Sequence, residues 1–553
     1  MSRIASDTVS PIATGAAKLR AHTALQIMPT EWRWLIVAAS LLTLVAFAPL
    51  IWFAIQGTGD SQFMGTLMNP VDGGTYLSKM QIGFRGGWLV TFQHTPEIHS
   101  GAFIQVIYPF LGHLSRLTGI PIQVMFHIAR LGAALFMYIA LYQFGAAVWS
   151  KVRARRLFFL IVSLGAGFGL ALQPLFQTTD FPDLTLPEAF PFFSSLMNVH
   201  FPLTIGLLAL LGALLIVALR PGAESDNTAD RALPLAALTS LGLAIIFPQT
   251  LAPLGAALVL YVGFDSIKQR RISKRLIAWL LTIGLPALPL FIYYMLVVST
   301  NPAMATWNQQ NQTLAPPVHI YLLGFGLPII LALPGIWRAL RRFEADGDRL
   351  MLLWLLAMMI ATFLPTNIQR RFSAGIMIPI AYFATRAIED VWLRYISRRR
   401  RNIAFALAFA IMPISLGFVL SAPVIGFAIN PQSMSAVLLD RNYVAAFAWL
   451  RPRVDSNDVV LASPTVSIWI PAYADGRVVY AHPYETLNAQ DREMQVATWF
   501  STEATPEQCR ALLEAYSVRY ILVGPQERTL GDSPCIDSLT EIAEAGSVSI
   551  YAP

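Results

Sequence analysis

Charged side chains are scarce in this 553-residue chain: 13% of its residues are Asp, Glu, Lys or Arg, whereas 55% are hydrophobic. This composition excludes an ordinary soluble enzyme of this length and is typical of a polytopic membrane protein. The shortage of charge is uneven, because apolar runs long enough to cross a bilayer recur from Trp34 to Leu420 and then stop. The sequence therefore predicts an α-helical membrane domain followed by a C-terminal domain of ordinary composition.

A cleavable signal sequence is also not expected. The first thirty residues are polar, and the first apolar run, Leu35 to Ile55, is long enough to span the membrane and remain as an anchor. The net charge of +7 does not indicate nucleic-acid binding, because the basic residues lie in short clusters between apolar runs, as in cytoplasmic loops. We expect no nucleic-acid partner, and we expect the lipid bilayer of the plasma membrane as the surroundings.

The distribution of Lys and Arg predicts the orientation, with the mildly basic N-terminus in the cytoplasm. The run Ala102 to Leu117 contains Pro109 and Arg116 and separates polar from apolar side chains on a helical wheel, so we interpret it as an interfacial helix. If this run were counted as a span, the basic cluster at 151–156 would lie on the extracytoplasmic side, against the usual bias of Lys and Arg towards the cytoplasm. About eleven spans result: Leu35–Ile55, Ile122–Val148, Leu157–Leu172, Leu203–Leu219, Leu233–Phe247, Leu251–Phe264, Leu276–Val298, Ile320–Trp337, Leu350–Leu364, Phe372–Val391 and Ile403–Leu420.

The predicted organisation has three parts: a cytoplasmic segment 1–32, a multi-pass domain 33–430 with an outer loop 56–120, and an extracytoplasmic domain 431–553. Strand-like and helical stretches alternate in the third part, which favours a small soluble α/β domain. It has no glycine-rich phosphate loop, so we interpret it as a substrate-binding or lid module, or as a structural appendage. The only cysteines, Cys509 and Cys535, lie in this part, where a disulfide could persist; the sequence does not decide whether they are bridged.

Polar chemistry gathers on the predicted outer face. The loops Gln173–Phe201 and Ser299–Val318 contain no Lys or Arg, and the first outer loop begins the polar stretch Gly57–Gly101. The carboxylates and histidines expected on this face include Asp60, Asp72, Glu97, His94, His99, Asp180, Asp183, Glu188, His200 and His319.

Arg370 and Arg371, in TNIQRRF (366–372), oppose the charge bias because they lie on the outer side just before a span. One interpretation is snorkelling at the interface, or pairing with Asp180 or Asp183. The other is a clamp for a lipid phosphate, because a guanidinium offers a rigid fork of donors to phosphate oxygens. Arg130, near the outer end of its span with His127, could line the same cavity, although a buried ion pair would explain it equally well.

Four short motifs accompany this layout: DGGTYLSK from Asp72, GGW at 86–88, HTPE from His94 and QRRF at 369–372. Together with many spans and an outer C-terminal domain, they resemble the GT-C superfamily of integral membrane glycosyltransferases, which take sugar from polyprenyl-phosphate carriers. The resemblance implies an acidic catalytic residue in the first outer loop, at Asp72 or Asp60. The sequence departs from the family in lacking an adjacent acidic pair or a clear DxD motif.

The chemistry of such a transfer assigns roles to these residues. The phosphate leaving group needs cationic stabilisation and the acceptor hydroxyl needs a carboxylate, which Arg370 or Arg371 and Asp72 supply. Asp72, which is flanked by glycines that would admit a bulky substrate, could instead only cap a turn. A divalent metal at HTPE or EIH stays possible, without a second cluster to support it. The candidate substrate-binding residues are Tyr76, His94, Glu97, His99, Arg130, His200, Arg370 and Arg371.

The function predicted from the sequence is transfer of a sugar from a polyprenyl-phosphate donor to a glycan, lipid or protein acceptor on the extracytoplasmic face. The alternative is a transporter or flippase of a lipid-linked glycan. Transporters favour paired repeats with polar, broken helices at mid-membrane, whereas the spans here are mostly apolar and the polar residues crowd one face.

Overall fold

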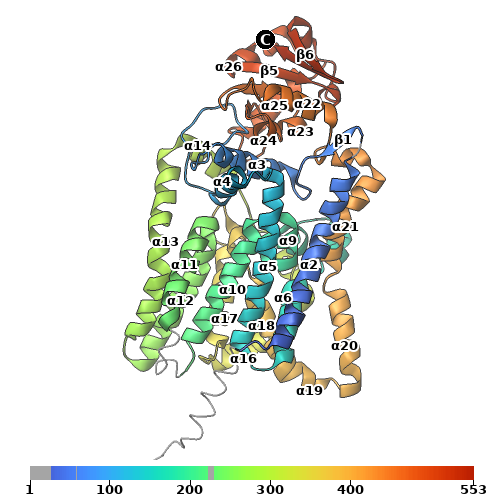
Figure 1. The fold of residues 1–553 in the computed structure, drawn as a ribbon. Helices are drawn as coiled ribbons and strands as arrows, with labels where there is room; N and C mark the ends of the chain where they lie inside the picture. Colours follow the sequence, from blue (N-terminus) through green and yellow to red (C-terminus); the bar gives the residue numbers. More distant parts are fainter. Residues whose placement is uncertain (1–25, 58, 222–229) are drawn as a thin grey trace, which may run out of the picture.

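The computed structural model describes residues 26–57, 59–221 and 230–553. Helices stand side by side as an elongated bundle, and a small sheet domain made by the C-terminal part of the chain lies at one end of it (Figure 1). Of the segment 1–32 that we assigned to the cytoplasm, residues 1–25 lie outside the described residues.

Seven helical stretches of the described chain are long and apolar enough to cross a membrane: Pro29–Gln56, Ile122–Val148, Val152–Phe176, His200–Ala218, Pro248–Gln269, Lys274–Thr300 and Arg399–Ile429. They include α2 (Pro29–Gln56), α5 (Ile122–Val148), α10 (His200–Ala218), α12 (Leu251–Gln269) and α13 (Lys274–Thr300). Each of these stretches coincides with an apolar run of the sequence, so the multi-pass character of the chain follows from its composition. The count of about eleven spans stays a prediction.

Two of these seven stretches, Val152–Phe176 and Arg399–Ile429, are each broken into two helices, and the remaining predicted spans are shorter or broken as well. The break between α6 (Val152–Leu164) and α7 (Gly169–Phe176) lies against the break between α15 (Val318–Leu323) and α16 (Gly326–Arg342). A Cβ on Gly167 would stand 2.2 Å from the Gly324 carbonyl oxygen, so the two backbones touch there and only glycine fits. The other short elements are α11 (Leu233–Ile246), α17 (Asp348–Thr362), α18 (Met377–Ala387), α20 (Arg398–Ile411) and α21 (Ile414–Ile429).

Two segments that the sequence presented as loops contain helices. The loop Ser299–Val318 includes α14 (Pro302–Gln310), which begins at Asn301, whose side-chain oxygen accepts from the backbone N–H groups of Ala303 and Met304. The loop Gln173–Phe201 includes α8 (Pro182–Thr185) and α9 (Pro191–Met197). We missed α14 because its capping residue and Pro302 are start signals that we did not weigh against its polar composition.

The first outer segment forms two crossed helices beneath the sheet domain, α3 (Pro70–Phe84) and α4 (Ile107–Thr118) (Figure 1). Their backbones touch: a Cβ on Gly83 would lie 1.9 Å from the Pro109 carbonyl oxygen, and a Cβ on Gly112 would lie 1.9 Å from that of Met80. The helix expected from Ala102 therefore begins at Ile107. Phe110 and Leu117, on the face that the sequence assigned to lipid, are exposed.

The C-terminal part forms a five-stranded sheet with strand order β4-β3-β5-β7-β6. Strands β4 (Arg477–Val478), β3 (Val459–Leu461) and β5 (Val518–Val523) are parallel, whereas β7 (Val548–Ala552) and β6 (Thr540–Ala545) add antiparallel strands. The strand-like stretches of the sequence are VVLAS from Val459, RVVYAH from Arg477, VRYILVG and SVSIYA, and they coincide with β3, β4, β5 and β7. Strand β6 was not predicted, because its TEIAEA stretch is mostly exposed. The helices of this part are α22 (Arg441–Leu450), α23 (Pro464–Ser467), α24 (Ile470–Tyr473), α25 (Ala489–Trp499), α26 (Pro506–Ala515) and α27 (Pro525–Arg528).

Three contacts hold the sheet domain together and to the bundle. Cys509 and Cys535 form a disulfide. Strand β1 (Ser61–Phe63), directly after α2, pairs antiparallel with β2 (Leu438–Asp440), which precedes α22. A Cβ on Gly74 of α3 would lie 2.5 Å from the Ile468 side chain, so the domain rests directly on α3. These contacts place the segment after β4 beside the N-terminal turn of α3.

Candidate functional site

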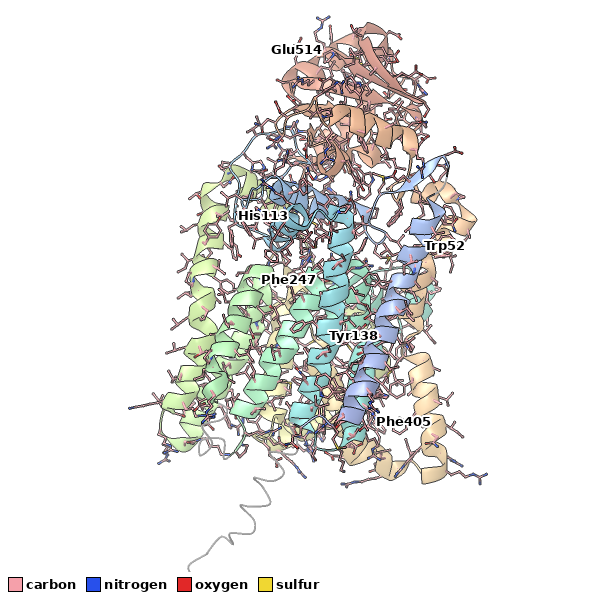
Figure 2. The ribbon with its side chains drawn as sticks, in the orientation of Figure 1. Trp52, His113, Tyr138, Phe247, Phe405 and Glu514 are labelled. Atoms are coloured by element: carbon pink, nitrogen blue, oxygen red, sulfur yellow. A yellow bond between two sulfur atoms is a disulfide. The ribbon has the colours of Figure 1, made fainter. Side chains whose placement is uncertain are left out.

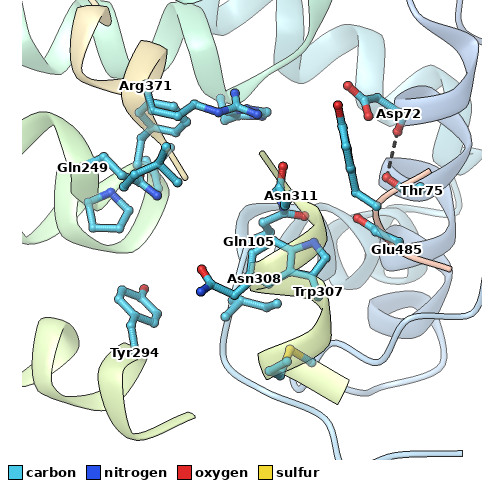
Figure 3. A pocket seen from close by; sticks show the side chains of 18 of the residues that line it. Asp72, Thr75, Gln105, Gln249, Tyr294, Trp307, Asn308, Asn311, Arg371 and Glu485 are labelled. Carbon is cyan, nitrogen blue, oxygen red and sulfur yellow. Dashed lines mark hydrogen bonds between the residues drawn. The ribbon is translucent and has the colours of Figure 1, made fainter. Parts of the chain in front are cut away.

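A cavity of about 900 Å³ opens between the bundle and the sheet domain (Figure 3). Its walls come from α3, the start of α4, the start of α10, the end of α13, α14, and the 3₁₀ turn η5 (Gln369–Ser373). The segment 482–485 of the sheet domain closes one side. A space of this size suits a ligand of a few hundred cubic ångströms or more, so it is the candidate site.

Asp72 lies in the first turn of α3 and lines this cavity. Asn69 caps the helix: its Oδ1 accepts from the Asp72 backbone N–H at 3.3 Å, and its Nδ2 donates to Asp72 Oδ2 at 2.7 Å. The positive end of the helix dipole favours a carboxylate there. The VDGG segment is thus the start of a helix rather than an isolated turn. Its glycines pack against protein, because a Cβ on Gly73 would lie 2.1 Å from Thr66 Oγ1; they do not face the substrate as we expected.

His482 holds the Asp72 carboxylate from the opposite domain. Its Nε2 lies 2.9 Å from Asp72 Oδ1, and its Nδ1 accepts from the backbone N–H groups of Tyr484 and Glu485, both at 3.0 Å. Since Nδ1 is an acceptor, the proton lies on Nε2 and is donated to Asp72. The Asp72 side chain is 37% exposed and so stays accessible from the cavity.

The charge balance around Asp72 favours its ionised form. Burial raises the pKa of its carboxyl, but the hydrogen bond from His482 and the positive charges of Arg371 and Lys79 outweigh burial and lower that pKa below its usual value. Beside it, Lys79 Nζ lies 2.5 Å from Glu485 Oε1 in a buried ion pair. Burial raises the pKa of Glu485, but the nearby positive charge of Lys79 outweighs burial, and the pKa lies below its usual value. Both carboxylates are therefore ionised at neutral pH.

Arg370 and Arg371 both line the cavity, and Arg371 lies across it from Asp72 (Figure 3). Arg371 Nη1 is 3.7 Å from Glu188 Oε1, and its guanidinium lies 6.0 Å from the ring centre of Phe201. The alternative of a pairing with Asp180 or Asp183 does not match the contacts of the described residues: the carboxylate near Arg371 is Glu188, and Asp183 accepts from the Gly169 backbone N–H. Within the described part of the chain, the buried Nε of Arg370 has no hydrogen-bond partner.

Tyr76 and His200 form an aromatic wall of the cavity. The Tyr76 ring stacks on Tyr108 with centroids 4.4 Å apart, and the Tyr108 hydroxyl lies 2.6 Å from His200 Nδ1. Burial and the charge of Asp72 raise the pKa of Tyr76 well above its ordinary value, so its hydroxyl stays protonated.

The other sequence-predicted residues do not line the cavity. Asp60 is exposed, and its backbone carbonyl accepts from the Arg441 N–H. His94 is buried 3.0 Å from the Ile468 carbonyl oxygen, and burial lowers its pKa to about 4. His99 Nε2 accepts from the Phe92 backbone N–H, and Arg130 donates to the Leu196 carbonyl and stacks on Phe47 at 4.0 Å. Glu97 pairs with Arg492.

These residues make contacts that hold the fold together outside the cavity. The HTPE loop is fastened to the sheet domain, since Arg477 Nη1 donates to the carbonyls of Phe92 and Glu97. Arg130 is neither in the cavity nor in an ion pair with any described carboxylate. Among the residues that the structure describes, no three or more His, Cys, Asp and Glu side chains have the arrangement of a metal site.

Sequence reasoning missed His482, Glu485 and the role of Lys79. His482 is 410 residues from Asp72, so no local spacing connects them. The signal that was present is the polar stretch HPYE directly after the strand-like RVVYA, because residues at strand ends often form sites.

One family model, described as "Family of unknown function (DUF6541)", matches residues 183–550. No curated protein matches the chain.

Solved structures share the fold at low sequence identity. ArnT from Cupriavidus metallidurans, bound to undecaprenyl phosphate, is 12% identical with a TM-score of 0.56; the match covers 95% of this chain and 98% of ArnT. The oligosaccharyltransferase of Archaeoglobus fulgidus, tethered with an acceptor peptide, is 14% identical with a TM-score of 0.51, over 89% of this chain and 69% of that one. The mycobacterial arabinofuranosyltransferase AftD is 14% identical with a TM-score of 0.52, over 94% and 40%. These are GT-C enzymes, so the resemblance predicted from the sequence is confirmed for the fold.

Proposed function

We propose that this chain, which belongs to the DUF6541 family, is a membrane glycosyltransferase that moves a sugar from a polyprenyl-phosphate carrier to an acceptor. The observation that carries the proposal is the cavity in which the Asp72 carboxylate lies across from Arg371, with Arg370 in the same lining. The fold shared with ArnT, which was solved with undecaprenyl phosphate, supports the choice of donor.

The proposed reaction uses the two sides of the cavity separately. The guanidinium groups of Arg370 and Arg371 bind the phosphate that links sugar to carrier and stabilise the charge it gains on leaving. Asp72 accepts a hydrogen bond from the acceptor hydroxyl and takes its proton as the new glycosidic bond forms. The sugar–phosphate C–O bond breaks at the same carbon, and the carrier phosphate leaves. Because the pKa of Asp72 is low, the carboxylate is ionised from the start, and proton transfer comes late, as the hydroxyl oxygen becomes acidic.

The test is release of carrier phosphate. Purified protein in nanodiscs is incubated with short-chain polyprenyl-phosphate hexoses and a panel of glycan, lipid and peptide acceptors. We expect free polyprenyl phosphate and a glycosylated acceptor in equal amounts, and both should disappear in Asp72→Asn. Movement of the intact glycolipid across a vesicle membrane without carrier release would favour the flippase instead.

The proposal includes an arrangement across the membrane: a cytoplasmic segment 1–32, a multi-pass domain 33–430 with about eleven spans, and an extracytoplasmic domain 431–553. The basic cluster near Arg400 and the disulfide of the sheet domain support it, because reducing compartments rarely retain disulfides. Single cysteines at Arg400 and at Glu514, which lies on the sheet domain (Figure 2), test it, because both residues are exposed. In intact cells an impermeant thiol reagent should label Glu514→Cys and spare Arg400→Cys. The reverse pattern would show that the chain has the opposite orientation in the membrane.

A further inference from the structure

One wall of the cavity has a composition that neither phosphate binding nor proton transfer explains. It carries the amide side chains of Gln105, Gln249, Asn308 and Asn311 and the rings of Tyr294 and Trp307, which we call the amide wall. Figure 3 shows Trp307, Asn308, Asn311 and Gln105 close together, in the space between Asp72 and Arg371 as seen in that view. Between residues 245 and 311, the described residues that line the cavity include no charged side chain.

Two side chains of the amide wall have unused hydrogen-bond acceptors. Among the described residues, the buried Oε1 atoms of Gln105 and Gln249 have no partner. A buried amide oxygen without a donor is unfavourable, so such atoms commonly accept a hydrogen bond from a ligand or a water molecule. Gln105 also has φ of 46°, a left-handed conformation that a non-glycine residue adopts at a cost. The fold therefore tolerates both strain and an unmet acceptor at this position.

Trp307 is held firmly where it meets the cavity. Its ring packs against Phe92, with centroids 5.6 Å apart, and α14 is fastened at both sides of the site. Gln310 Nε2 donates to the Thr486 carbonyl at 2.8 Å, close to His482, and Asn367 Nδ2 donates to the Asn308 carbonyl at 3.0 Å, close to Arg370. The part of the amide wall that lies on α14 is thus fastened to the two segments that supply the proposed chemistry.

We propose that the amide wall binds an uncharged sugar ring, with its hydroxyls donating to Gln105 and Gln249 and its C–H face stacked on Trp307. This inference rests on the proposed function and specifies the substrate class at the same site. A prenyl tail offers no hydroxyl to an amide oxygen, and a phosphate needs the cations that this wall lacks. Amide acceptors beside a flat aromatic ring match a neutral polyol with one apolar face.

The first measurement compares two lipids that differ only in the sugar: polyprenyl phosphate and its non-reactive C-glycosidic phosphonate of a neutral hexose. Wild-type protein should bind the hexose lipid more tightly than the bare lipid. Trp307→Ala should weaken hexose-lipid binding about tenfold and Gln105→Ala or Gln249→Ala about threefold to tenfold, with bare-lipid binding unchanged. Gln309→Ala, on the exposed side of α14, is the matched control and should change neither.

The second measurement separates donor from acceptor. If the variants leave hexose-lipid binding unaltered but raise the acceptor KM by the same factors, the wall binds the acceptor sugar. Equal weakening of bare and hexose lipid, or no change in either measurement, overturns the inference. If the wild-type protein releases carrier phosphate and the variants bind and react as it does, the proposed function holds and the inference about the amide wall is wrong. Absence of carrier release with every donor would remove the proposed function, while the lipid comparison still decides whether the wall binds sugar.

Discussion

The helix bundle contains two groups of ionised side chains at its opposite ends, and they differ in how completely their charges are paired (Figure 1). At the end far from the sheet domain, Arg338 Nη2 lies 2.7 Å from Asp348 Oδ2, and Arg386 Nη2 lies 2.8 Å from Asp346 Oδ2. Beneath the sheet domain, Lys79 and Glu485 also form a close pair, but Arg371 lies 3.7 Å from its carboxylate neighbour Glu188, and the contrast is therefore between the arginines at the two ends.

The difference indicates different roles. Removing the buried Asp348 would leave the two arginines beside it without one of their partners, so loss of this carboxylate should destabilise the fold. Charges that remain incompletely paired beside a cavity are available to a ligand. The exposed fraction of the arginine side chain does not distinguish the two groups, because Arg386 is 21% exposed and Arg371 is 23% exposed. The four predictions below start with the largest expected effect on transfer.

The largest effect is expected from Asp72→Asn. The amide keeps the shape and can still accept from His482, but it cannot take a proton, so turnover should fall by about 10² to 10⁴. Asp60→Asn is the matched control, because Asp60 is exposed and outside the cavity, and its turnover should be nearly normal. Rates of carrier-phosphate release at matched expression give the comparison. Normal turnover in Asp72→Asn with collapse in Asp60→Asn would move the base to Asp60.

Arg371→Ala and Arg370→Ala should weaken donor binding by about 10- to 100-fold, because hydrogen bonds between charged groups contribute about 1.5–3 kcal/mol each. The Lys variants should lose less, since they keep the charge but not the planar fork. Titration of each variant with polyprenyl phosphate measures the effect. Unchanged affinity in both folded Ala variants would show that the two guanidinium groups only pack at the cavity edge.

His482→Ala should reduce turnover by about tenfold and move the acid limb of kcat/KM. Burial raises the pKa of Asp72, but His482 and nearby positive charges lower it below 3.8. Activity that needs the carboxylate is therefore present above this lowered pKa and is lost as the pH falls through it. Without His482 the pKa rises, so the loss begins at a higher pH. His482→Asn, which can still donate, should retain more of the wild-type profile; an unmoved limb in both variants would limit His482 to holding the domains together.

The smallest effect on transfer is expected at the far end. Asp348→Asn leaves Arg338 and Arg386 without one of their carboxylates, so the free energy of unfolding should fall by about 3 kcal/mol. Donor affinity should stay at the wild-type value. Thermal denaturation together with polyprenyl-phosphate titration tests both halves. A large loss of donor affinity in protein that is still folded would mean that the two ends are coupled and that the comparison fails.

Local pattern was enough for much of the fold. Apolar runs predicted the long helices, because a chain segment of about twenty apolar residues must satisfy its backbone hydrogen bonds internally in lipid. Alternation predicted four of the five strands of the sheet domain, and it failed for β6 because Thr540–Ala545 is polar and largely exposed. Breaks at Gly167 and Gly324 were not predicted, since they result from contact between two backbones far apart in sequence.

The sequence by itself determined that Asp72, Tyr76, His200, Arg370 and Arg371 are candidates for polar chemistry on one face, because charge bias and hydropathy are properties of each segment alone. Only the tertiary structure separated Asp72 from Asp60, removed His94, Glu97, His99 and Arg130 from the cavity, and brought His482 and Glu485 to it. Hydropathy can be read from a few neighbouring turns of chain. The hydrogen bond between His482 and Asp72 joins residues 410 positions apart, so it depends on how the sheet domain packs against α3.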